Sequence, residues 1–128
     1  MKDNIIFIDE NIPLLAHALA DCGIIFQFNG RNLSNNDLKE SNCNILFVRS
    51  TTNVNENLLK DTNVGFVGTA TSGTDHIDID YLINNSIYFA DAAGSNSNSV
   101  AEYVVYSILK WADIHKISIK NKNYPKIL

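Results

Sequence analysis

A loop rich in glycine and hydroxyl side chains, residues 67–78, is the part of this 128-residue chain best suited to chemistry. It reads Val-Gly-Thr-Ala-Thr-Ser-Gly-Thr-Asp-His-Ile-Asp, a pattern typical of a strand end, a loop and a helix start. Such loops present backbone N–H groups and hydroxyls to a small anion. The segment therefore predicts an anion site.

A second candidate group is Arg49 with Ser50, which directly follows the apolar run at 45–48. An arginine and a hydroxyl at the carboxyl end of a strand suit a carboxylate or a phosphate. The plainer interpretation, a surface arginine beside a turn serine, is equally open on the residues alone.

Several other kinds of site are excluded by spacing. Gly68 and Gly73 have the separation found in a nucleoside-triphosphate loop, but Thr74 stands where that loop needs lysine. A Gly-x-Gly-x-x-Gly sequence for a dinucleotide is absent. Asp75, His76 and Asp78 are too close along the chain to converge on one metal ion. We expect Asp78 to cap a helix, His76 to bond locally, and no metal site.

Charge and composition argue against several classes of function. The net charge is -4 with acids and bases interspersed, so nucleic-acid binding is not expected. Cys22 and Cys43 are too few for a zinc site or a disulfide framework, which indicates reduced thiols and a cytoplasmic protein. The first residues hold only a four-residue apolar run, Ile5–Ile8, so we expect neither a signal peptide nor a membrane span.

Short apolar runs alternate with helical patterns along the chain. Five strands separated by helices predict an α/β fold with a parallel, doubly wound sheet. In such sheets ligands bind outside the carboxyl ends of the strands. The polar loops above all fall at that edge. The predicted strands are Ile5–Ile8, Ile24–Phe28, Ile45–Val48, Val64–Val67 and Ile87–Ala90.

Capping residues in the sequence also predict where the helices begin and end. Asn11 is expected to cap a first helix that ends at Gly23, and Ser34 with Asp37 predicts a capping box. Residues 55–60 look helical, and Asp78 should cap a helix over residues 79–84. A last helix, 97–114, carries an apolar face that could complete this domain or belong to a neighbouring one. That face holds Val100, Val104, Ile108 and Trp111.

Four stretches, in order along nearly the whole chain, resemble the N-terminal part of the D-isomer-specific 2-hydroxyacid dehydrogenases. The resemblance is strongest to the branch that acts on 4-phosphoerythronate. The combination of Val-Arg-Ser at 48–50 with Gly-Thr-Ala-Thr-x-Gly-Thr-Asp-His at 68–76 is specific to that branch. The stretches are Ile8–Pro13, Val48–Asn55, Phe66–Asp78 and Ala93–Val104.

The resemblance implies an NAD-dependent oxidation of 4-phospho-D-erythronate to 3-hydroxy-2-oxo-4-phosphooxybutanoate, in pyridoxal phosphate (vitamin B6) biosynthesis. It implies a flavodoxin-like, five-stranded substrate domain over residues 1–93. Residues 97–114 would form a helix crossing to a cofactor domain, followed by a basic tail at 115–128. Ser50 and Thr71 match residues that hold the substrate in the family.

The family's glycine-rich cofactor loop and its catalytic Arg, Glu and His have no counterpart in this sequence. We therefore assign no catalytic residue and no NAD-binding residue, and expect a substrate-binding half, truncated before the NAD domain and inactive alone. A separate chain could supply the cofactor domain. A non-catalytic remnant, or a small anion-binding or interaction module, remains the alternative. Ser95 stands where the family usually has cysteine.

Overall fold

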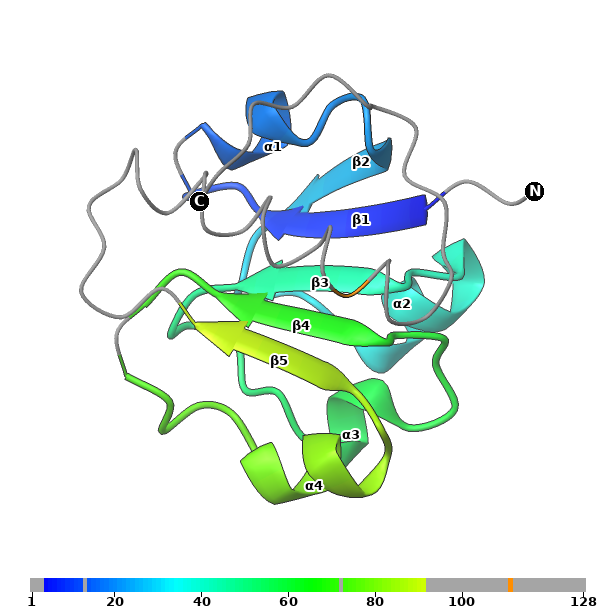
Figure 1. The fold of residues 1–128 in the computed structure, drawn as a ribbon, viewed down its shortest axis with the longest axis vertical. Helices are drawn as coiled ribbons and strands as arrows, with labels where there is room; N and C mark the ends of the chain where they lie inside the picture. Colours follow the sequence, from blue (N-terminus) through cyan, green and yellow to red (C-terminus); the bar gives the residue numbers. More distant parts are fainter. Residues whose placement is uncertain (1–3, 13, 72, 92–110, 112–128) are drawn as a thin grey trace.

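The computed structural model describes residues 4–12, 14–71, 73–91 and 111. Five parallel strands form one sheet in the order β2-β1-β3-β4-β5, and their arrows point to the same side in Figure 1. This is the strand order of flavodoxin-like, doubly wound folds. The strands are β1 (Asn4–Asp9), β2 (Gly23–Phe28), β3 (Ile45–Val48), β4 (Phe66–Thr69) and β5 (Tyr88–Asp91). The predicted fold class is confirmed.

Four short helices connect these strands: α1 (Leu15–Ala18), α2 (Asn35–Ser41), α3 (Glu56–Leu59) and α4 (Ile79–Asn84). The predicted capping box is present, because Ser34 accepts from the Asp37 N–H while Asp37 accepts from the Ser34 N–H. The Asp78 carboxylate accepts from the Tyr81 N–H at 3.0 Å and starts α4 as predicted. The helical pattern predicted at residues 55–60 contains α3. Three of the four helices, α2, α3 and α4, therefore lie where the sequence predicts them.

The first helix differs from its prediction. It has four residues, and its N-cap is Leu14 in the left-handed region, without a side-chain hydrogen bond, rather than Asn11. Gly23 does not end it but begins β2, where a Cβ would lie 2.3 Å from the Asn4 carbonyl oxygen. The Asn11 N–H instead donates to the Asp9 carboxylate, which keeps residue 11 in the turn after β1.

Strand β4 begins two residues later than predicted. The cause is pairing, since Ile45 of β3 lies opposite Phe66 and not opposite Val64. Gly65 and Phe66 both donate their N–H groups to the Asn44 carbonyl just before that register begins. Neighbouring strands, rather than the apolar run itself, therefore fix this boundary.

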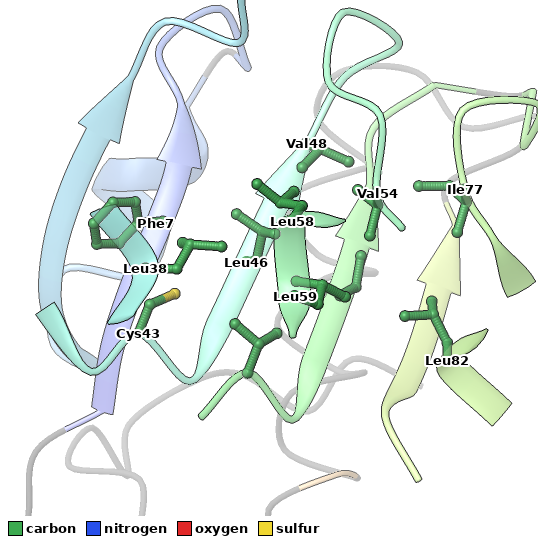
Figure 2. Close-up of a cluster of buried hydrophobic side chains, with 12 residues drawn as sticks. Phe7, Leu38, Cys43, Leu46, Val48, Val54, Leu58, Leu59, Ile77 and Leu82 are labelled. Atoms are coloured by element: carbon green, nitrogen blue, oxygen red, sulfur yellow. The ribbon is translucent and has the colours of Figure 1, made fainter. Parts of the chain in front are cut away.

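Side chains of β3 alternate between two buried layers, one on each face of the sheet. Ile45 and Phe47 pack toward the layer that contains Leu15 of α1. Leu46 and Val48 join the other layer, to which the helices contribute Leu38 of α2, Leu58 and Leu59 of α3 and Leu82 of α4 (Figure 2). All four β3 residues are buried, as expected for a central parallel strand.

Trp111 belongs to the layer on the α1 face. Its side chain is 3% exposed, and its ring centroid lies 5.6 Å from that of Phe66. Of the two possibilities for the apolar face of 97–114, this residue follows the first, because it completes the core of this domain. The other residues of 97–114 and of the tail lie outside the described part of the chain, so the boundaries at 93, 97 and 115 stay predictions.

Candidate functional site

The carboxyl ends of β3 and β4 bring the two candidate loops together. Val48 lies opposite Thr69 in the sheet, and the Ala70 N–H donates to the Val48 carbonyl at 3.0 Å. Ser50 and Thr71 each follow this last pair by two residues. The structure therefore places both predicted substrate residues at one edge, with Ser50 exposed and Thr71 half-buried.

Three polar side chains at this edge form what we call the hydroxyl–imidazole cluster: Thr69, Thr71 and His76. The Thr69 Oγ1 lies 2.9 Å from the Thr71 Oγ1 and 2.9 Å from the His76 Nε2. The Thr71 Oγ1 is 3.5 Å from the same ring nitrogen, and the Thr71 N–H donates to the Thr69 Oγ1 at 3.4 Å. The prediction of a locally bonded histidine is confirmed.

Backbone pairing holds His76 in place. Val54 forms an isolated parallel bridge with Ile77. The Val54 N–H donates to the His76 carbonyl at 2.8 Å, and the Asp78 N–H donates to the Val54 carbonyl at 2.8 Å. Both Val54 and Ile77 are buried beneath α3 and α4 (Figure 2). The imidazole is thus fixed from a segment that is separate from β4.

The environment of His76 favours the neutral imidazole. Burial lowers its pKa below the ordinary value, and the nearby Asp75 carboxylate opposes this only in part. Among the described residues, no group of three or more His, Cys, Asp or Glu side chains could hold a metal ion. Hydroxyl and imidazole groups of this kind can bind an anion by hydrogen bonds.

Asp9 and Gly30 support the loop that carries Ser50. The Thr52 hydroxyl donates to the Gly30 carbonyl at 2.9 Å. A Cβ on Gly30 would lie 2.3 Å from the Thr51 Oγ1 and 2.6 Å from the Asp9 Oδ2. One Asp9 oxygen accepts from the Asn11 N–H at 2.8 Å, while its Oδ2 is buried and has no hydrogen-bond partner among the described residues. The Gly30 turn and the 50–52 loop are therefore packed directly together.

This support was not among the predictions from the sequence. Asp9 directly follows the predicted strand Ile5–Ile8 and Gly30 lies just after the predicted strand Ile24–Phe28, but their contact joins segments about 20 residues apart. A buried aspartate directly after an apolar strand, opposite an Asn-Gly turn, is the signal that could have found it.

The glycines of the 68–76 loop do not form a nucleotide loop. Gly68 lies within β4, and a Cβ there would be 2.5 Å from the Phe47 ring, so this glycine makes room for the core. The Gly73 position has no atom within 4 Å of an added Cβ. Gly68 thus serves the packing of the core, and Gly73 lies where a side chain would have room.

A separate groove lies between β2 and α2. It is lined by apolar rings, including Phe7 and Phe26, and by the acidic side chains of Asp37 and Glu40. Two carboxylates make it a poor place for an anion. Within the described ranges, no helix is long and apolar enough to cross a membrane. Both cysteines are buried and neither forms a disulfide.

Comparison with known proteins identifies relatives of this chain. The family model for the catalytic domain of D-isomer specific 2-hydroxyacid dehydrogenases matches residues 5–122. The erythronate-4-phosphate dehydrogenase of Psychromonas ingrahamii is 45% identical over 118 residues, 92% of this chain and 30% of that protein. The enzyme of the same name from Marinobacter nauticus is 49% identical over 109 residues, 85% of this chain and 28% of the relative. The chain thus spans about 30% of the length of such relatives.

Solved structures show the same fold. A D-lactate dehydrogenase from Aquifex aeolicus, complexed with NAD and lactic acid, superimposes with a TM-score of 0.59 at 19% identity. The match covers 96% of this chain and 41% of that one. A phosphoglycerate oxidoreductase from Vibrio cholerae matches with a TM-score of 0.54 at 18% identity, covering 94% and 43% of the two chains.

Proposed function

The chain belongs to the D-isomer-specific 2-hydroxyacid dehydrogenase family, and we propose that it is the substrate-binding part of an NAD-dependent 4-phosphoerythronate dehydrogenase. The observation that carries this proposal is the meeting of Arg49-Ser50 with Thr71 at adjacent strand ends, where ligands bind in parallel α/β sheets. Relatives at 39–49% identity carry the matching enzyme name.

The substrate proposed is a small phosphorylated hydroxy acid, 4-phospho-D-erythronate, and the product is its 2-oxo acid. Its two anionic groups suit the Arg49 guanidinium and the hydroxyls of Ser50 and Thr71. The pathway implied is pyridoxal phosphate biosynthesis, and the two reduced, buried thiols support a cytoplasmic location.

We assign to none of these residues the binding of NAD or the role of the catalytic base. Oxidation needs a positioned nicotinamide and a base for the hydroxyl proton, and this chain has neither the cofactor loop nor a matching catalytic group. They would come from further residues of the enzyme or from a separate cofactor-domain chain. We infer that the 128-residue chain alone binds substrate weakly and does not bind or reduce NAD.

A second candidate function is a non-catalytic anion-binding module. The hydroxyl–imidazole cluster favours it, because Thr69, Thr71 and His76 together bring three hydrogen-bonding side chains to this edge of the sheet. The two functions differ in one respect: only the dehydrogenase half gains activity when a cofactor domain of the family is added.

An amide NMR titration of the isotope-labelled chain with 4-phosphoerythronate tests both candidates. Signals of residues 49–52 and 69–75 should shift, with a dissociation constant of about 1 mM, since two or three charge-assisted hydrogen bonds contribute only about 1.5–3 kcal/mol each. The double variant Ser50→Ala, Thr71→Val should lose the shifts.

Thr62→Val is the matched control, because the Thr62 hydroxyl donates to the Leu59 carbonyl at 2.7 Å, outside the candidate loops. That variant should bind normally. Shifts that gather on other residues, or that survive in the double variant, would show that Ser50 and Thr71 do not hold the substrate here.

A further inference from the structure

We propose that His76, Thr69 and Thr71 form a hydrogen-bond relay, and that a proton on the His76 Nε2 is what turns the Thr71 hydroxyl toward a bound anion as a donor. This inference rests on the proposed function and adds two residues to it. Thr69 and His76 would be positioning residues, which act on the ligand only through Thr71.

The relay is inferred from the position of the Thr69 hydroxyl, which lies between the Thr71 hydroxyl and the His76 imidazole. The Thr69 side chain is 2% exposed, so water cannot satisfy its hydroxyl. Its oxygen lies 2.9 Å from the Thr71 Oγ1 and 2.9 Å from the His76 Nε2. A hydroxyl has one hydrogen to donate and can accept as well. The Thr69 oxygen also accepts from the Thr71 N–H at 3.4 Å, and its single hydrogen can be donated to only one of the two side chains.

Two directions of donation are possible. If Nε2 lacks a proton, Thr69 donates to it, so the Thr71 Oγ1 receives no hydrogen from Thr69 and can itself donate to Thr69, away from the ligand. If Nε2 carries a proton, His76 donates to Thr69 and Thr69 donates to Thr71. The Thr71 hydrogen is then left for a phosphate or carboxylate oxygen.

An anion accepts hydrogen bonds and donates none. The second direction leaves the Thr71 hydrogen to the anion, whereas in the first direction the anion competes with the Thr69 oxygen for that hydrogen. Hydrogen bonds in a chain also strengthen one another, so the direction that ends on the anion gains from every link. The bound state should therefore hold His76 with its proton on Nε2, either as that neutral tautomer or as the cation.

Side-chain ¹⁵N NMR of His76 tests the relay in the intact 128-residue chain. Spectra are recorded without ligand and with saturating 4-phosphoerythronate, and inorganic phosphate serves as a simpler anion. The expected result is a protonated Nε2 in both bound states. A bound state with an unprotonated Nε2 would overturn the relay whatever the affinity.

Variants give an independent readout. Thr69→Val and His76→Leu break the relay and should weaken binding about fivefold or more, the effect of one hydrogen bond. Thr69→Ser retains the hydroxyl, and His76→Gln retains an N–H donor, so both should bind within about twofold of the parent chain. Near-normal binding by Thr69→Val, in a variant whose amide spectrum shows the native fold, would overturn the relay.

The outcomes separate this inference from the function it rests on. If Thr71→Val loses binding while Thr69→Val and His76→Leu keep it, the site is correct and the relay is wrong. If the parent chain shows no shift at residues 49–52 and 69–75, both the site and the relay are wrong.

Discussion

Gly30 leaves the space in which the 50–52 loop packs on the end of β1. Adding one methyl group would place it 2.3 Å from the Thr51 Oγ1 and 2.6 Å from the Asp9 Oδ2. Gly30→Ala should therefore lower the free energy of unfolding by about 1–3 kcal/mol, the usual cost of overpacking. Urea unfolding measures this.

Gly73→Ala is the matched control, because an added Cβ there meets no atom within 4 Å. It should leave stability unchanged or slightly raised, since alanine restricts the unfolded chain. Equal stabilities of the two variants would mean that the Gly30 contact is not tight.

A second prediction concerns a single residue, the buried Cys43, and the dependence of stability on pH. Burial raises the pKa of its thiol from 9.0 to about 12, while its Sγ donates to the Ile45 carbonyl at 3.3 Å. A group whose pKa is higher in the folded state favours folding below its unfolded pKa, and this contribution falls as pH rises. Stability should therefore decline between pH 9.0 and about 12.

Cys43→Ala is the control for this slope. Lysines and tyrosines also titrate in that range, so the test is the difference between the two unfolding curves. The parent chain should lose stability relative to the variant as pH rises above 9.0. Parallel curves would show that the thiol titrates alike in the folded and unfolded states.

Residue roles that depend on near neighbours were predictable from the sequence. The capping box at Ser34, the cap at Asp78 and the local bonding of His76 each involve partners within seven positions. The contact of Asp9 with Gly30 was not predictable in this way, because it depends on how two strands and two loops pack.

Helices and strands show the same difference: features set by local sequence were predicted, and features set by distant contacts were not. Their order and parallel pairing follow from five apolar runs alternating with helices, and were predicted. The start of β4 was not, since the register against Ile45 fixes it. The first helix was overextended because its N-cap uses Leu14 in a left-handed conformation, with φ of 66°. The sequence pattern that favoured Asn11 as the cap does not indicate that Leu14 takes this position.

Helix α1 can be stabilised at this N-cap. Leu14 is 57% exposed, so its side chain contributes little packing, while a left-handed conformation costs a residue with a Cβ about 1 kcal/mol or more. Leu14→Gly should raise the thermal midpoint by a few degrees. Leu14→Ala keeps the strain without the leucine side chain, and should not. If both variants melt together, backbone strain at residue 14 does not limit α1.

At the scale of the whole molecule, the question is where the domain ends. The sequence predicted a boundary at residue 93 and an apolar face on 97–114 that could complete this domain or belong to a neighbouring one. Trp111 bears on this directly, because it packs on Phe66 and in the layer with Ile6, Leu15 and Phe47. An added Cβ on Gly65 would lie 3.3 Å from its ring.

Trp111→Ala should therefore lower the free energy of unfolding by about 3–5 kcal/mol, the cost of removing a large buried aromatic ring. Trp111→Phe should retain a substantial part of that stability. Because the chain has one tryptophan, its fluorescence in the parent chain reports the exposure of this ring alone. A blue-shifted emission that moves to the red together with the far-UV circular dichroism would place Trp111 within the same cooperative unit as the sheet. An emission typical of water in the folded chain, or an alanine variant of unchanged stability, would return the boundary to residue 93.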